Sequence, residues 1–127
     1  SPYIYACESI EIATTEGKFI FTNESNKFLY QGKAVNDDEF KRFFNDLVNT
    51  PSDEFYTEQT EGEAEFTVRY TYLDKYASLY GREYDEISYL DSDGRKFVLN
   101  LNGKPLFKVN AVYVQRLVES INVIISG

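Results

Sequence analysis

The stretch VNDDEFKRFFNDL, residues 35–47, predicts an amphipathic helix. Its apolar side chains recur at positions i, i+3, i+4 and i+7, which places them on one face of a helix. These side chains are Phe40, Phe43, Phe44 and Leu47. Asn36 can cap the first free N–H groups, and the acidic residues after it suit the positive end of the helix dipole. Because a helix of about 12 residues is unstable alone in water, its apolar face must pack against another element.

A second stretch, residues 109–121, repeats this pattern after a second Val-Asn pair. Asn110 takes the place of the capping Asn36, and apolar residues follow at the same spacing. They are Val114, Leu117, Val118 and Ile121. Upstream of the helices, residues 18–21 (KFIF) match residues 96–99 (KFVL). The shared cap, apolar face and preceding strand favour an internal duplication.

Alternation of apolar and polar residues predicts the strands. The clearest strand is residues 66–72, where aromatic and apolar residues alternate with Thr and Arg. A strand with one solvent-exposed face and one buried face is typical of an antiparallel sheet. The other expected strands span residues 9–13, 18–22, 27–30, 87–90, 96–101 and 106–108.

Residues 76–81 are ambiguous. We expect a return strand here, after a turn at residues 74–75, because Tyr favours strands and Gly81 interrupts a helix. The helical spacing of Tyr76, Tyr80 and Tyr84 supports the alternative of a helix. The same three tyrosines are the candidate binding surface, since exposed Tyr offers apolar area with a polar tip.

Together these patterns predict a single α+β domain of 127 residues. We expect an antiparallel sheet with two packed helices, built from two related β-β-β-α halves. The halves are residues 8–51 and 65–126, and residues 52–64 form an acidic linker.

Composition narrows the classes of function. The net charge of −8 repels phosphate backbones and anionic lipids, so we expect neither a nucleic-acid partner nor binding to a membrane surface. The absence of His excludes Ser-His and Cys-His catalysis and imidazole metal ligands. The single Cys7 excludes an intramolecular disulfide and a thiolate zinc cluster.

Cys7 has two interpretations. It is a small buried hydrophobic residue, or a lipidated one, since residues 4–7 (IYAC) faintly resemble a lipoprotein cleavage site. The chain begins with Ser1 and contains no Met, so we expect that it has been trimmed. The sequence therefore leaves open whether the native protein has a membrane tether outside this chain.

The carboxylates carry no catalytic signature. Residues 91–94 (DSDG) resemble part of a calcium loop, but they lack its further ligands and we expect a turn. The sequence has no glycine loop for phosphate and no dinucleotide motif. We therefore expect no catalytic residue, no metal and no cofactor, although carboxylate pairs in space stay open.

Several segments resemble a bacterial domain-of-unknown-function family, number 4340. In the first half these are residues 9–12, 17–21, 28–30 and the helix at 40–47, and in the second half residues 84–85, 93–98 and the helix after Val109. Phe28 lies nearest to the place where the family often has Trp. The resemblance implies an extracytoplasmic domain held by an N-terminal membrane helix. Some relatives accompany ABC-type export or gliding-motility machinery, and the family has no active-site residues to transfer.

We therefore expect a non-enzymatic extracytoplasmic domain of a bacterial membrane-anchored protein, acting in protein interaction or as a structural accessory. Its partner is expected to be a protein, such as a membrane transport or surface complex. One alternative is a glycan or cell-wall binding module that uses clustered Tyr. The other is a small carboxylate-dependent hydrolase.

Overall fold

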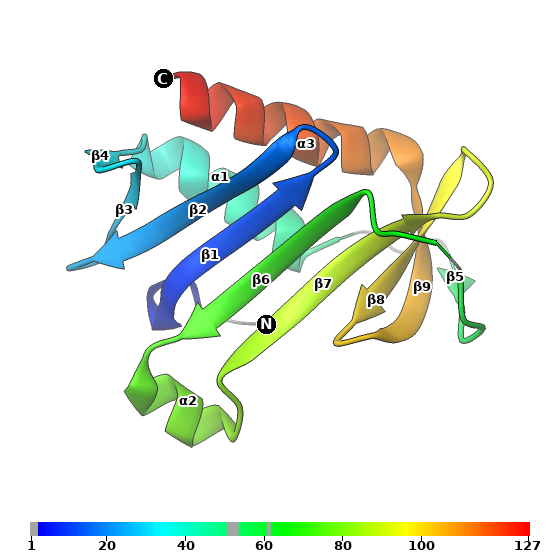
Figure 1. Cartoon of the computed structure of the whole chain (residues 1–127), viewed down its shortest axis with the longest axis horizontal. Coiled ribbons are helices and arrows are strands. Elements are labelled where there is room, and N and C mark those ends of the chain that lie inside the picture. Colours follow the sequence, from blue (N-terminus) through cyan, green and yellow to red (C-terminus); the bar gives the residue numbers. More distant parts are fainter. Residues whose placement is uncertain (1–2, 51–53, 61) are drawn as a thin grey trace.

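The computed structural model describes residues 3–50, 54–60 and 62–127, and within these ranges nine strands form one antiparallel sheet (Figure 1). The strand order is β4-β3-β2-β1-β6-β7-β8-β9-β5. The strands are β1 (Cys7–Thr14), β2 (Gly17–Glu24), β3 (Lys27–Tyr30), β4 (Lys33–Ala34), β5 (Glu54–Phe55), β6 (Phe66–Tyr72), β7 (Tyr84–Asp91), β8 (Lys96–Leu101) and β9 (Lys104–Asn110). The helices are the 3-10 turn η1 (Ile4–Ala6) and the α-helices α1 (Asp37–Val48), α2 (Asp74–Tyr80) and α3 (Ala111–Ser126). The expected α+β class with an antiparallel sheet is confirmed.

The core lies between one face of the sheet and the helices α1 and α3, which lie on the same side of the sheet (Figure 1). From the sheet, β6 contributes every second residue to this core, which follows from the alternation of side chains along a strand. From the helices come Phe40, Phe43, Phe44 and Leu47 of α1 and Ala111, Val114, Leu117, Ile121 and Ile124 of α3. Val118 is half-buried against this cluster.

Both helices begin at the expected caps. The side chain of Asn36 accepts a hydrogen bond from the backbone N–H of Glu39 at 3.0 Å. The side chain of Asn110 accepts one from the N–H of Val112 at 2.8 Å. Each bond satisfies a donor that the first helical turn leaves free, so both predicted caps are confirmed.

The expected return strand at residues 76–81 is wrong, because these residues lie in and directly after the helix α2. Gly81 does not interrupt the helix but ends it, with a left-handed backbone (φ 74°) whose N–H bonds to the carbonyl of Ala77. Glycine adopts this conformation without the clash that a Cβ causes, and it is the usual residue just after a helix.

Two residues of the expected acidic linker take part in the sheet. Glu54 and Phe55 form β5, which pairs with Lys108 and Phe107 of β9 and closes one edge of the sheet. Of this segment, residues 52–53 and 61 lie outside the described residues. Sequence periodicity over two residues cannot reveal a strand, so the pairing could not be predicted.

The turn at residues 91–94 is confirmed. The carboxylate of Asp91 accepts from the N–H of Gly94, and the carboxylate of Asp93 accepts from the N–H groups of Arg95 and Lys96. Both aspartates therefore serve the backbone of the turn.

Candidate functional site

The three candidate tyrosines lie in two places. Tyr76 and Tyr80 are on α2 with ring centroids 6.0 Å apart, and both are partly buried against the core. Tyr80 also meets Tyr72 of β6 edge to face at 5.0 Å. Tyr84 begins β7 and pairs with Thr71, so it lies on the face of the sheet opposite the buried Tyr72. The structure thus brings Tyr76 and Tyr80 together and sets Tyr84 apart from them.

A buried carboxylate lies beside the α2 tyrosines. Asp85 is 7% exposed and accepts hydrogen bonds from Tyr72 Oη at 2.6 Å and Asn102 Nδ2 at 2.9 Å. The guanidinium of Arg82 adds bonds of 2.7 and 2.8 Å from Nε to the two carboxylate oxygens. This group could not be found in the sequence, because its members come from a strand end, a loop, a second strand and a turn. Nothing in their spacing marks them.

The electrostatics of Asp85 favour a structural role. Burial raises the pKa of Asp85, but the hydrogen bonds from Arg82, Tyr72 and Asn102 outweigh burial and hold the pKa below its usual value. Burial and the same carboxylate raise the pKa of Tyr72 and bring the pKa of Cys7 to about 12. Asp85 is therefore a carboxylate and Cys7 a neutral thiol at neutral pH. A general acid needs a raised pKa, so Asp85 ties α2 to the sheet rather than supplying a proton.

A cavity of about 590 Å³ adjoins this group between α2 and the ends of β1 and β6. Arg82 lines it, but its guanidinium is already bound to Asp85. The other charged side chains of its lining are Glu8, Asp74 and Glu83. Among the described residues, no group of three or more Asp, Glu or Cys side chains is arranged to hold a metal ion.

The face of the sheet opposite α1 and α3 carries a row of charges across four neighbouring strands. Lys18 of β2 forms an ion pair with Glu11 of β1, with Nζ and Oε1 2.9 Å apart. Arg69 of β6 contacts Glu86 of β7 through Nε and Nη2, each 2.9 Å from Oε2. Glu11 and Arg69 are direct neighbours in the register of β1 and β6.

Tyr84 lies beside this row. The guanidinium carbon of Arg69 is 4.2 Å from the centroid of the Tyr84 ring, which is a cation–π distance. Tyr84 is 44% exposed, and Ile20 of β2 is 48% exposed. We call this surface, carried by Glu11, Lys18, Ile20, Arg69, Tyr84 and Glu86, the open face.

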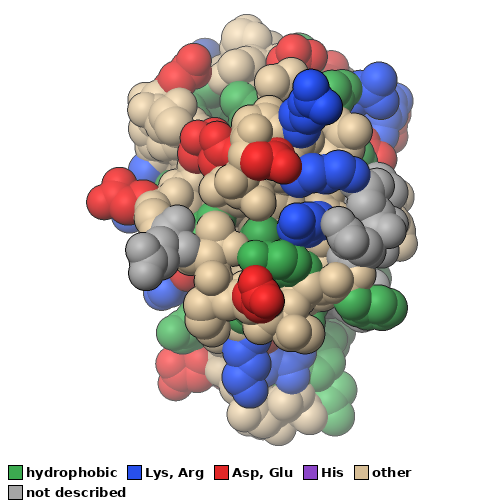
Figure 2. Space-filling model, turned by 90° about the vertical axis from the view of Figure 1, so that its right-hand side faces the viewer, with side chains coloured by type: hydrophobic (Ala, Val, Ile, Leu, Met, Phe, Trp, Pro, Cys, Tyr) green, Lys and Arg blue, Asp and Glu red, His purple; other side chains and the backbone are tan. Residues whose placement is uncertain are grey.

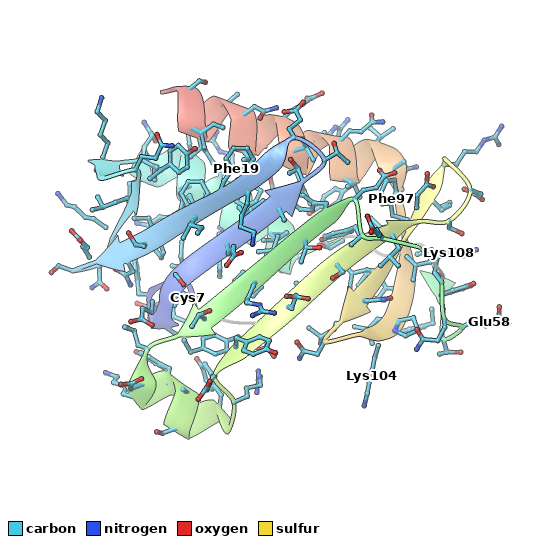
Figure 3. The ribbon with its side chains drawn as sticks, in the orientation of Figure 1. Cys7, Phe19, Glu58, Phe97, Lys104 and Lys108 are labelled. Carbon is cyan, nitrogen blue, oxygen red and sulfur yellow. The ribbon has the colours of Figure 1, made fainter. Side chains whose placement is uncertain are left out.

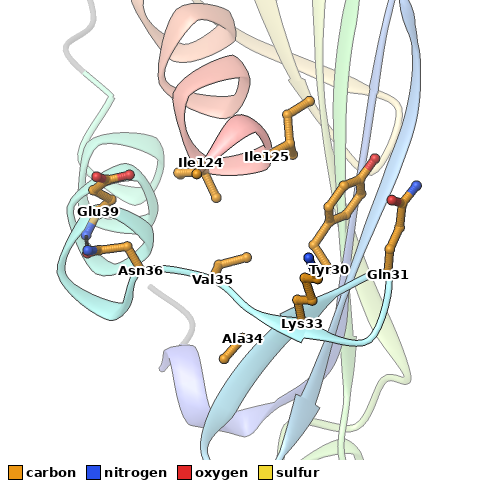
Figure 4. Close-up of a pocket in the computed structure, with 10 residues that line it drawn as sticks. Tyr30, Gln31, Lys33, Ala34, Val35, Asn36, Glu39, Ile124 and Ile125 are labelled. Atoms are coloured by element: carbon orange, nitrogen blue, oxygen red, sulfur yellow. Dashed lines mark hydrogen bonds between the residues drawn. The ribbon is translucent and has the colours of Figure 1, made fainter.

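Another cavity, of about 350 Å³, lies where the β3–β4 hairpin meets the start of α1 and the end of α3 (Figure 4). Val35, Ile124 and Ile125 give it apolar walls, and Lys33 and Glu39 add charges of opposite sign. Asn36 lines it too, but its side chain is used by the cap of α1.

The edge formed by β9 and β5 is mixed in character. Basic, acidic and apolar side chains lie intermixed when the molecule is viewed from this edge (Figure 2). Lys108 lies with its Nζ 4.8 Å from the centroid of the Tyr56 ring, and Glu58 is exposed nearby (Figure 3). Phe55 is 90% exposed.

Comparison with known proteins gives no relative: no family model, no curated protein and no solved structure matches the chain. Among its described residues, the chain has no helix with the length and apolar character needed to cross a membrane.

Proposed function

We propose that this chain is a non-enzymatic interaction domain of a bacterial membrane-anchored protein, and that it binds a protein partner through the open face. The extracytoplasmic location is part of the proposal and rests on the family resemblance described above. The observation that carries the proposal is the contact between Tyr84 and Arg69. The ion pair with Glu86 holds Arg69 in place for this contact.

Three properties of the open face support recognition. Its side chains project from the middle of a wide sheet, so their backbones are fixed before binding. Tyr and Arg dominate the energetic centres of protein interfaces, and here the two are already in contact. The ion pair with Glu86 limits the conformations of Arg69, which lowers the entropy lost on association.

Asp85 does not fit the role of the proton donor that the hydrolase alternative requires. A carboxylate-dependent hydrolase needs one carboxyl group whose pKa is raised so that it can donate a proton. The most buried carboxylate of the described chain has its pKa lowered instead. Glycan binding through tyrosine stays as the alternative, with Tyr84 as the exposed ring.

We also propose that the domain arose by duplication of one unit. The strands of the two halves correspond in a different alignment from the sequence match of residues 18–21 with residues 96–99. Counted outward from the centre of the sheet, one half runs β1-β2-β3-β4 and ends in α1, and the other runs β6-β7-β8-β9 and ends in α3. β1 and β6 meet antiparallel at the centre, as two copies related by a two-fold axis would. In this alignment α2 is an insertion in the connection between β6 and β7.

A photo-cross-linking amino acid in place of Tyr84 tests the binding proposal in cells of the source organism. The same substitution at Phe55, which is 90% exposed on the sheet edge, is the matched control. We expect one protein to be cross-linked from position 84 only. Purified, that protein should bind the domain at least about tenfold more weakly after Arg69→Ala.

Equal cross-linking from both positions, or none from position 84, contradicts the proposal. Competition by soluble cell-wall fragments for the cross-link at position 84 supports the glycan alternative instead.

A further inference from the structure

A third cavity, of about 280 Å³, lies away from the open face, between the β1–β2 turn, the start of β6 and the N-terminal half of α3. Its floor is apolar and is formed by Phe66, Phe97, Val114 and Val118. Figure 3 shows Phe97 beside the start of α3. Ligand pockets for small molecules run from about 300 to 1,000 Å³, so this cavity suits a single large side chain better than a cofactor.

The charged side chains at the rim of this cavity are all acidic. Glu16, Glu65 and Glu119 line it, all three are exposed, and no Lys or Arg is among its lining residues. None of the three glutamates is in an ion pair with a residue that the structure describes. Their charges are therefore available to a partner, in contrast to the paired carboxylates of the open face.

Two of these glutamates project from fixed backbone positions. The N–H of Glu16 donates to Thr14 Oγ1 at 3.1 Å within the β1–β2 turn. The N–H of Glu65 donates to the carbonyl of Tyr89 at 3.0 Å, which ties it to β7. Glu119 follows Val118 on α3. The carboxylates thus surround the apolar floor from three separate elements.

We propose that this cavity binds a basic segment of a partner protein, with one large apolar side chain inserted and flanking Lys or Arg residues paired with the glutamates. The apolar floor provides burial for the inserted side chain, and the rim selects positive flanks and disfavours acidic ones. An acidic rim also repels anionic lipid headgroups, which disfavours an anionic membrane surface as the occupant. This site is separate from the open face and does not depend on it.

Synthetic peptides with blocked termini test the proposal. Their binding to the whole chain is followed through the amide chemical shifts of the protein. The probe is Gly-Lys-Phe-Lys-Gly; a second peptide replaces Phe by Ser and a third replaces both Lys by Glu. We expect the first peptide to perturb the amides of Thr15, Phe66 and Val118, and to bind more weakly as salt is added. Loss of Phe burial should weaken binding about tenfold or more.

Variants of the protein separate this site from general attraction to an acidic surface. Glu119→Lys should weaken binding of the basic peptide about fivefold and improve binding of the acidic one. Glu58→Lys makes the same change of charge at an exposed glutamate outside the cavity and should leave binding nearly unchanged. Equal effects of the two variants, equal binding of the Ser peptide, or no perturbation around the cavity would overturn the proposal. Cross-linking at Tyr84 reports on the open face alone, so the two proposals can fail separately.

Discussion

Tyr72 donates a hydrogen bond of 2.6 Å to the buried carboxylate of Asp85, and so joins the last residue of β6 to the second residue of β7. Arg82, in the segment between α2 and β7, binds the same carboxylate. This one group therefore fixes both ends of the segment that contains α2. Hydrogen bonds to a charged group contribute more to stability than neutral ones.

Tyr72→Phe should lower the free energy of unfolding by about 1.5–3 kcal/mol, because it removes one charge-assisted bond from a buried carboxylate. Chemical denaturation measures this loss. Tyr76→Phe is the matched control: Tyr76 is partly buried on α2 and its hydroxyl has no hydrogen bond within the described chain. Its loss should stay within about 0.5 kcal/mol. Equal losses in the two variants would show that the bond to Asp85 contributes nothing.

Acid should weaken the fold through Asp85. Its pKa in the folded state is lowered, so its contribution to stability is complete above its unfolded pKa of about 3.9 and is lost as the pH falls through the folded value. In urea denaturation between pH 7 and pH 2, Asp85→Asn should therefore destabilise the protein at pH 7 and show a smaller further loss in acid than the wild type.

Glu58→Gln removes an exposed carboxylate and should keep the acid sensitivity of the wild type. If Asp85→Asn and wild type lose stability in parallel down to pH 2, the hydrogen bonds of Asp85 do not control its ionisation.

Phe43 of α1 is 2% exposed and lies in the core. Phe43→Ala should cost about 3–5 kcal/mol, because the surrounding side chains cannot fully close the space that the ring leaves. Denaturant titration of Phe55→Ala gives the comparison, since Phe55 is 90% exposed and should lose less than about 0.5 kcal/mol. A loss below about 1 kcal/mol for Phe43→Ala would contradict its place in the core.

The contrast between these two residues explains how much of the fold could be predicted. Phe43 belongs to a periodic set, so its burial on a helix follows from spacing alone. Phe55 lies in a two-residue strand whose partner in β9 is distant in the sequence, and no local pattern encodes that pairing.

The residues of the candidate site also differ in how far they could be predicted from the sequence. Tyr84 could be selected as an exposed ring, but its contact with Arg69 depends on the register of β6 and β7. Asp85 could not be selected at all, because its importance comes from burial and from three partners in separate segments.

Gly81 ends α2, the helix that the structure has in place of the expected return strand. Gly81 has φ 74°, and a Cβ added there would meet nothing within 4 Å, so substitution strains the backbone without creating a clash. Gly81→Ala should therefore cost about 1 kcal/mol, the penalty of a left-handed conformation in a residue with a Cβ. The loss should appear as faster amide hydrogen exchange in α2, with protection of β1 and β6 unchanged. Gly81→Asn should recover part of the loss, since Asn tolerates this conformation better than Ala. If Ala and Asn behave alike, or if exchange rises equally across the sheet, then Gly81 does not act as the end of α2.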